Sequence, residues 1–343
     1  MATIKDVARL AGVGLGTASR VVSGKGSVSP ATAARVRKAI EQLEFRPSHA
    51  ARSLLSGSSQ MIGVYIPVLQ GTFYTSILQA IDMGLRANGQ HMVVAFGQGA
   101  GDPRQQAMEG IEFLIERGCD GLIVICDALL DDDIAALLAK QKHLVVLNHY
   151  YKGLREQCFS ADHKLGGKLA AQTLLEQKHR KFAVIAGPAT SPDNVARISG
   201  FMTELESHGI DASSVLLVES DFSSAGGRVA ATALLASGKK FSAVFCANDE
   251  MAVGALSRFQ EAGISVPGMI SVLGYDDTQI AEYSSPGLTS VHIPWNDVTL
   301  NGLYWLLNQC YHLSLPIKRK FPISVTQRAS VAAPPAQRRS SSK

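Results

Sequence analysis

The chain has 343 residues, 46% of them hydrophobic and 18% charged, with a net charge of +4. This length exceeds a single average domain, and the apolar fraction is enough for a large buried core. Nowhere do about eighteen apolar residues run without interruption, and the N-terminus lacks the apolar stretch of a secretion signal. Membrane spanning and secretion are therefore disfavoured, and we expect a cytoplasmic protein.

Cysteines and histidines give no sign of a metal or disulfide framework. The five cysteines are odd in number and widely spaced, with no CxxC pair, and the nine histidines show no ligand spacing. The glycines at 12, 14 and 16 follow a helical pattern rather than a strand, which is the wrong context for a pyrophosphate loop. No nucleophile elbow is present. We expect no metal, no cofactor and no catalysis.

The first 47 residues predict a small helical domain. Apolar residues recur at helical spacing from Ile4 to Ala11, and Gly12 ends that helix. A second short helix follows, with Ala18 and Val21 turned inward. A third helix opens at Ser29-Pro30, a cap residue followed by proline. Two short helices about one turn apart make a helix-turn-helix. Residues 1 to 60 hold nine Lys and Arg and three acids, a net charge of +6 that suits a phosphate backbone.

The start of the second helix is where a helix-turn-helix meets the major groove. This places Leu15, Gly16, Thr17 and Arg20 near bases or phosphates. Gly16 lies inside the helix at a cost of about 1 kcal/mol relative to alanine. We therefore expect this helix to fray in the free protein and to become ordered on DNA.

Residues 48–60 predict a hinge and linker. The stretch 48–56 has small side chains, a lone arginine and adjacent leucines. It is too short to hold a helix in water, where isolated helices under about twelve residues are marginal. A helix here needs DNA or a partner to form.

From residue 61 to about 330, short apolar strands alternate with amphipathic helices. The strands are expected at MIGVYIP, HMVVAF, GLIVI, LVVLN, FAVIAG, SAVFCA and ISVLGY. Apolar runs of this kind predict an α/β fold with parallel sheets covered on both faces. A polar stretch at 157–164 offers a crossing point, so two sheets with a cleft between them are expected. The cleft, beyond the carboxyl ends of the strands, is the expected small-molecule site.

Several segments in order resemble one family. They are KDVARLAGV with TASRVVSG, RPSHAARSL, TFYTSIL, ARISGF, CANDEMAVGAL, VPGMISVLGYDD, PGLTSV and QRASV. The chain resembles the LacI/GalR family of bacterial transcription regulators over residues 2 to about 330, closest to the galactose and β-glucoside regulators. The resemblance implies a two-lobed, periplasmic-binding-protein-like body with two parallel Rossmann-like sheets. It implies crossovers near 161, 290 and 322, with an N-lobe of about 61–160 and 291–321 and a C-lobe of about 161–290 and 322–330.

The resemblance also implies the DNA contacts. Leu15 and Gly16 match positions that set operator preference, and Thr17, Ser19 and Arg20 match anchoring positions. Thr3, at the start of the first helix, joins these DNA-binding candidates. The sequence departs from the family at Gly14, where relatives usually carry a serine cap.

In the family, the hinge segment folds on the operator, enters the minor groove and inserts a leucine into the central base step. Leu54 matches that leucine, and His49, Ala51 and Arg52 flank it. Such a wedge kinks DNA and couples binding to shape. The alternative is an ordinary linker in which Leu54 docks on the body.

The resemblance also implies effector contacts at the ends of the body strands, and Arg197 is one of them. The alternative to effector binding by Arg197 is an ion pair within one lobe, with Asp249 or Asp276. For Asp277 a structural role is favoured over effector binding. A charged or amide group can bridge sugar hydroxyls while an aromatic face packs on the ring. The effector candidates are Phe73, Tyr74, Asn148, Arg197, Phe222, Asn248 and Asp276.

Together these features predict an effector-controlled repressor of carbohydrate-utilisation genes, acting as a homodimer on a pseudo-palindromic operator. The expected effector is a monosaccharide, a disaccharide or a sugar phosphate. Alternatives are a purine or nucleoside effector, a cytosolic sugar receptor, or an architectural DNA-bending protein. The Pro/Ser/Arg-rich tail 331–343 is expected to be disordered and lacks the leucine heptads of a tetramerising helix.

Overall fold

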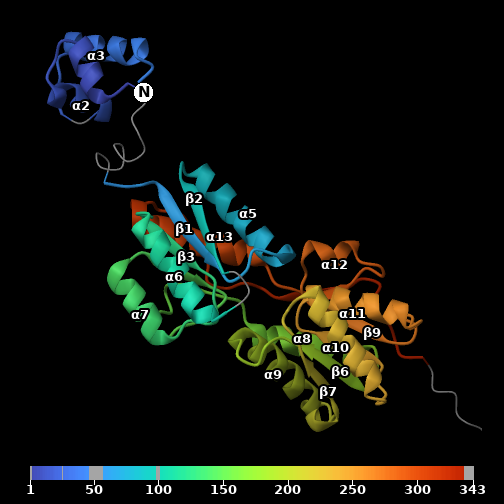
Figure 1. Ribbon diagram of the computed structural model, residues 1–343. Coiled ribbons are helices and arrows are strands. Elements are labelled where there is room, and N and C mark those ends of the chain that lie inside the picture. Colours follow the sequence, from blue (N-terminus) through green and yellow to red (C-terminus); the bar gives the residue numbers. More distant parts are fainter. Residues whose placement is uncertain (1, 25, 46–56, 98–100, 336–343) are drawn as a thin grey trace, which may run out of the picture.

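The computed structural model describes residues 2–24, 26–45, 57–97 and 101–335. At the N-terminus, helices α1 (Ile4–Leu10), α2 (Leu15–Ser23) and α3 (Pro30–Gln42) form the expected helix-turn-helix head (Figure 1). Its small core is made of side chains that are at most 6% exposed: Val7, Ala11, Val36 and Ala39. The short apolar residues at helical spacing are therefore the ones that hold the three helices together.

The first lobe is a five-stranded parallel sheet with strand order β2-β1-β3-β4-β5. Its strands are β1 (Met61–Ile66), β2 (His91–Phe96), β3 (Gly121–Val124), β4 (Leu144–Leu147) and β5 (Cys158–Phe159). Helices α5 (Gly71–Ala87) and α13 (Trp295–Tyr311) cover one face. Helices α6 (Pro103–Glu116) and α7 (Asp131–Lys140) cover the other. The apolar strands are buried on both faces, as parallel strands between helices require.

The second lobe is a six-stranded sheet with strand order β11-β10-β9-β8-β6-β7, in which only β11 runs antiparallel. Its strands are β6 (Phe182–Ala186), β7 (Leu216–Glu219), β8 (Ala243–Cys246), β9 (Ser271–Asp276), β10 (Thr289–His292) and β11 (Ser324–Thr326). Its helices are α8 (His163–Glu176), α9 (Pro192–Ser207), α10 (Ser224–Ala236), α11 (Asp249–Glu261) and the short α12 (Gln279–Tyr283). The pairs α8/α9 and α10/α11 pack on opposite faces, so the body has two α/β lobes, as the sequence predicts.

The chain crosses between the lobes three times. It leaves the first sheet after β5, returns through residues 293–294 into α13, and enters the second lobe again before β11. The boundary expected near 290 is slightly early, because β10 pairs with β9 as far as His292. The crossover therefore follows that strand.

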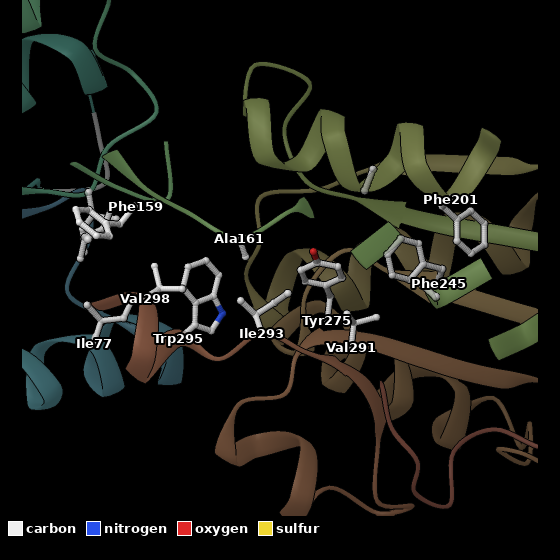
Figure 2. Close-up of a cluster of buried hydrophobic side chains, with 14 of the residues drawn as sticks. Ile77, Phe159, Ala161, Phe201, Phe245, Tyr275, Val291, Ile293, Trp295 and Val298 are labelled. Atoms are coloured by element: carbon white, nitrogen blue, oxygen red, sulfur yellow. The ribbon is translucent and has the colours of Figure 1, made fainter. Parts of the chain in front are cut away.

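A continuous apolar cluster fills the crossover region. Figure 2 shows Trp295, Ala161 and Ile293 between Phe159 on the first lobe and Tyr275 on the second. These side chains are at most 7% exposed. The two lobes therefore share one packed core at their junction.

The tail is ordered further than expected. The Ala332 carbonyl accepts hydrogen bonds from His179 Nε2 and Ser271 Oγ, both at 2.9 Å, and its N–H donates to Ser271 Oγ at 3.0 Å. The expectation of disorder from 331 is therefore wrong at Val331 and Ala332. Residues 336–343 lie outside the described part of the chain.

None of the helices in the described residues is long and apolar enough to cross a membrane. All five cysteines are free thiols, four of them buried and Cys310 half-buried. Burial raises the pKa of the Cys126 thiol to about 11, which leaves it protonated and unreactive at neutral pH.

Candidate DNA-binding face and effector site

Helix α2 presents three of the predicted DNA contacts to solvent, two in its first turn and Arg20 in its last. Leu15 is 47% exposed, Gly16 and Arg20 are also exposed, and Ala18 on the opposite side is fully buried. The N-cap residue of α2 is Gly14, which offers no side-chain hydrogen bond to the free N–H groups, as the sequence predicts. An exposed leucine at the start of a recognition helix is available to a base edge.

The other DNA-binding candidates are either partly occupied by contacts within the head or lie outside the described residues. Thr3 caps α1, because its Oγ1 accepts from the Asp6 N–H at 3.4 Å while its own N–H donates to Asp6 Oδ2 at 2.9 Å. Thr17 and Ser19 are half-buried in α2. Contacts of these three residues with DNA remain predictions. The hinge candidates lie outside the described residues, and they are His49, Ala51, Arg52 and Leu54.

Arg197, in α9, is the centre of the candidate effector site. Its side chain is 3% exposed, and its Nη2 donates to Asp193 Oδ2 at 2.6 Å and lies 3.8 Å from Asp276 Oδ1. Its Nη1 donates to the Ala247 carbonyl at 2.6 Å. The ion pair within the lobe therefore exists with Asp276 but chiefly with Asp193, four residues earlier on the same helix. The suggested pair with Asp249 is wrong.

Asp249 has a different role. Its carboxylate accepts hydrogen bonds from Ser290 Oγ at 2.6 Å and from the N–H and hydroxyl of Thr278 at 2.7 and 3.0 Å. Burial raises its pKa to about 8, and the nearby charge of Asp276 adds to the effect. This aspartate ties β10 and the segment after β9 to the start of α11.

Burial and the guanidinium set the charges around Arg197. Burial opposes ionisation of Asp193, but the Arg197 charge overcomes it, and the pKa of Asp193 is held well below its usual range. Burial raises the pKa of Asp276 to about 6 although Arg197 opposes the rise. The site therefore contains one carboxylate firmly ionised by the guanidinium and a second that titrates close to neutral pH.

Aromatic rings line the guanidinium. Its central carbon lies 4.2 Å from the centroid of the Tyr275 ring and 5.9 Å from that of Phe222. A Cβ atom at Gly187 would come within 2.2 Å of the Phe222 ring, so glycine is required there for this ring to reach its place. The backbone of Phe222 has φ +66°, which costs energy for a bulky residue and is held by the surrounding contacts.

The first lobe contributes aromatic residues from the start of α5. The Phe73 ring makes edge contacts with Tyr74 and Trp295, each with ring centroids 5.0 Å apart. Trp295 Nε1 in turn donates to Asp276 Oδ1 at 3.2 Å. Burial raises the pKa of Tyr74 far above its usual value, and the charges of nearby carboxylates add to this. The structure thus brings Phe73 and Tyr74 to the lobe junction, next to the second-lobe carboxylate.

Two amides also reach the junction. Asn148, at the end of β4 with φ +64°, donates to Asp193 Oδ2 at 3.0 Å, and its Oδ1 lies 2.7 Å from His163 Nε2. Asn248 caps α11, because its Oδ1 accepts from the Met251 N–H and its Nδ2 donates to the Phe222 carbonyl, both at 2.9 Å. Asn148 therefore connects the two lobes, and Asn248 orients the loop that carries Phe222.

The lobes are closed on each other. Ser191 Oγ donates to Asp127 Oδ2 of the first lobe at 2.7 Å. At the mouth, the N–H and hydroxyl of Thr72 both donate to Glu250 Oε1 at 3.0 Å. A cavity of about 390 Å³ lies beside this closed junction, and Asp276, His292 and Trp295 are among the residues that line it.

Sequence reasoning missed several residues of this site. Asp193 could have been found from its i,i+4 spacing to Arg197, which places both on one helix face. Asp127, His163 and Trp295 carried no such signal, because their partners lie far away in the sequence. Within the described ranges no group of three His, Cys, Asp or Glu side chains is placed to hold a metal ion.

Two carboxylates outside this cluster have structural roles, as expected for Asp277. Asp277 forms an ion pair with Arg328, with 2.7 Å between Asp277 Oδ1 and Arg328 Nη2, and its Oδ2 lies 3.0 Å from His292 Nδ1. Asp133, the last of the triple aspartate at the start of α7, pairs with Arg104 at 2.7 Å and accepts from the Leu130 N–H at 2.8 Å. These contacts hold turns and helix starts in place.

Comparisons with known proteins agree with this architecture. The profile described as "Bacterial regulatory proteins, lacI family" matches residues 3–48, and "Periplasmic binding protein-like domain" matches 171–331. The HTH-type transcriptional regulator GalR of Escherichia coli K12 is 32% identical over 335 residues, covering 97% of both chains. The HTH-type transcriptional repressor PurR of Vibrio atlanticus is 33% identical over 311 residues, covering 90% of this chain and 92% of its own.

Solved structures agree as well. A LacI-family regulator from Burkholderia phymatum is 50% identical, with a TM-score of 0.78, over 80% of this chain and 99% of its own. The lac repressor dimer bound to operator and the anti-inducer ONPF is 27% identical, with a TM-score of 0.83, over 97% and 99%. The CelR–cellobiose complex is 28% identical, with a TM-score of 0.67, over 96% and 100%.

The matches run through both the helix-turn-helix head and the two-lobed body, and the matched relatives are transcription regulators rather than enzymes. The chain belongs to the LacI family of bacterial DNA-binding transcriptional regulators.

Proposed function

We propose that this regulator represses carbohydrate-utilisation genes and that a sugar bound between the two lobes controls its affinity for the operator. The observation that carries the proposal is the cluster around Arg197, which combines buried charged and amide groups with aromatic rings at the lobe junction. The relative CelR, solved as a cellobiose complex, supports a sugar as the ligand class.

The chemistry of the cluster suits a sugar. A sugar offers vicinal hydroxyls to charged and amide groups, and an apolar face to an aromatic ring. The Arg197 Nε–H is buried and has no hydrogen-bond partner within the described residues, so it is a donor open to a ligand. The effector contacts we propose are Phe73, Tyr74, Asn148, Arg197, Phe222, Asn248 and Asp276.

The DNA-binding domain comprises residues 1–47, the hinge and linker 48–60, and the effector-binding and dimerising body the residues from 61 to about 330. The homodimer we propose is supported by the similar lac repressor, which is solved as a dimer bound to operator. The DNA contacts we propose are Thr3, Leu15, Gly16, Thr17, Ser19, Arg20, His49, Ala51, Arg52 and Leu54.

Regulation follows from a difference in sugar affinity between the state that binds DNA and the state that does not. The polar contacts that close the lobes, Thr72 to Glu250 and Asn148 to Asp193, are the ones that a ligand between the lobes rearranges. We expect sugar binding to lower the affinity for the operator, which is induction.

The test is operator binding measured by fluorescence anisotropy with the full chain. The duplex is first selected from a random-sequence library by the unmodified protein. D-galactose, cellobiose, D-ribose, hypoxanthine and guanine are then added one at a time. We expect one sugar to change the dissociation constant at least about fivefold, within the usual range of allosteric coupling.

The control is Arg258→Lys, a conservative change of a half-buried side chain on α11 that bonds to Thr232 away from the cluster, and it should respond as the unmodified protein does. If only a purine changed the affinity for the operator, the effector would be a purine and the proposed sugar effector would be wrong. If none of the sugars or purines changed the affinity for the operator duplex, control by a sugar or purine effector would be contradicted.

A further inference from the structure

The carboxylate of Asp120 collects hydrogen bonds from the segment that joins the head to the body. This residue stands immediately before β3, and its backbone N–H donates to the Met61 carbonyl at 2.8 Å. Its carboxylate oxygens accept from Ser58 Oγ at 2.6 Å, Ser59 N at 2.8 Å, Ser59 Oγ at 3.0 Å, Gln60 N at 2.8 Å and Tyr311 Oη at 2.8 Å.

These bonds hold residues that lie just before the sheet. The pairing of β1 begins at Met61, and Gln60 has one backbone bond to the sheet, in which its carbonyl accepts from the His91 N–H at 2.9 Å. Asp120, about sixty residues later in the sequence, adds the bonds that fix Ser58, Ser59 and the Gln60 N–H to the body. Burial opposes ionisation of Asp120, but hydrogen bonds from Ser58, Ser59 and Tyr311 keep its pKa below the usual value. An ionised carboxylate only accepts, which matches five donors around it.

Helix α13 reaches the same carboxylate from the other side. Tyr311 is its last residue, and Cys310 Sγ also contacts the Asp120 carbonyl at 3.3 Å. The first residue of the helix is Trp295, whose indole N–H donates to Asp276 at the candidate effector site. One helix, about 25 Å long at 1.5 Å per residue, thus touches the lobe junction at one end and the root of the linker at the other.

We propose that Asp120 is a positioning residue for DNA binding: it fixes residues 58–60, where the chain from the DNA-binding head enters the body, against β3 and the end of α13. The head then starts from a defined point on the body. Losing the bonds frees backbone that has to be ordered again on the operator, and ordering one such residue costs roughly a factor of ten in affinity. The inference rests on DNA binding by the head and not on which effector the body binds.

The test compares full-length variants for affinity to the selected duplex, without effector, and for hydrogen exchange of the amides of Ser59 and Gln60. Asp120→Asn leaves one acceptor oxygen where two are needed, so at least one group of donors loses its partner. We expect at least a tenfold loss of duplex affinity and at least a tenfold faster exchange of these two amides.

Two smaller changes and a control complete the design. Ser59→Ala removes one donor without a change of charge, and Tyr311→Phe removes only the bond from α13. Each should give a smaller change in the same direction, about threefold, so the inference stays testable even if Asp120→Asn does not fold. Asp132→Asn removes the same charge from an exposed position on α7 of the same lobe, and it should stay within twofold of the unmodified protein.

The outcomes separate the possibilities. Faster exchange with duplex affinity kept within twofold would show that Asp120 only stabilises the lobe, and would overturn the positioning role. Unchanged amide exchange at Ser59 and Gln60 in Asp120→Asn would show that the Asp120 carboxylate does not hold residues 58–60. A protein that binds the duplex but ignores every sugar would defeat the proposed effector and leave the Asp120 comparison intact.

Discussion

Replacing Arg197 by alanine is the most informative single perturbation of the body. The guanidinium is 3% exposed and pairs with Asp193, whose side chain is 6% exposed. It also donates to the Ala247 carbonyl and lies over the Tyr275 ring. Removing it leaves a buried carboxylate without its cation and a buried carbonyl with one partner fewer.

The expected cost is large. Breaking a buried ion pair by removing one partner costs about 3–5 kcal/mol, because the remaining charge stays buried and unpaired. We therefore expect Arg197→Ala to lower the free energy of unfolding of the body by about 4 kcal/mol. For a domain of this size that corresponds to a fall in Tm of roughly 8–16 °C.

The assay is thermal and urea unfolding of the full chain, followed by circular dichroism. The double variant Arg197→Ala/Asp193→Asn removes both charges, so it should recover about half of the loss. Lys240→Ala, an exposed substitution in the same lobe, should change stability by no more than about 0.5 kcal/mol.

A loss below about 1 kcal/mol in Arg197→Ala, or a double variant less stable than the single one, would contradict a stabilising role of the Arg197–Asp193 pair. Either result would mean that Asp193 does not depend on the guanidinium for its charge. The pair would then contribute nothing to the organisation of the site.

Three other changes test the junction and the head. Burial and a neighbouring carboxylate raise the pKa of Asp127 to about 7, so its stabilising contribution is lost as pH rises from about 4 to 7; Asp127→Asn should therefore show a smaller fall in Tm over that range than the unmodified protein. Glu250→Gln weakens the contact with Thr72 and should raise the radius of gyration in small-angle scattering, whereas the exposed Glu261→Gln should not. Gly16→Ala, at a position with open space for a Cβ, should stabilise α2 by about 1 kcal/mol and slow its amide exchange.

Most of the fold could be predicted because its strands are short apolar runs and its helices are amphipathic. The strands that the sequence did not predict are those where this pattern fails. In β10, Thr289 and Ser290 are fully buried with their hydroxyls hydrogen-bonded, so the strand does not read as apolar. Strand β7 is half exposed at the sheet edge, and β5 has only two residues. Tertiary contacts, which leave no periodic signal, decide such elements.

The site divides in the same way. Residues at or just after the end of a strand, such as Asp276 and Asn148, could be placed because parallel strands bring their carboxyl ends to one edge. The ordered tail could not, since Ala332 is held by His179, 153 residues earlier in the chain. Nor could the Asp120 clamp, because nothing local distinguishes this aspartate from the many that precede a strand.

Sugar control of operator binding is tested most directly by reciprocity between the two ligands. Calorimetry gives the dissociation constant of a responding sugar for the full chain with and without the selected duplex, and anisotropy gives that of the duplex with and without the sugar. If the sugar controls operator affinity, both constants change by one common factor, in the range of about 5 to 150. A sugar that binds equally well to the free and the operator-bound protein would contradict it.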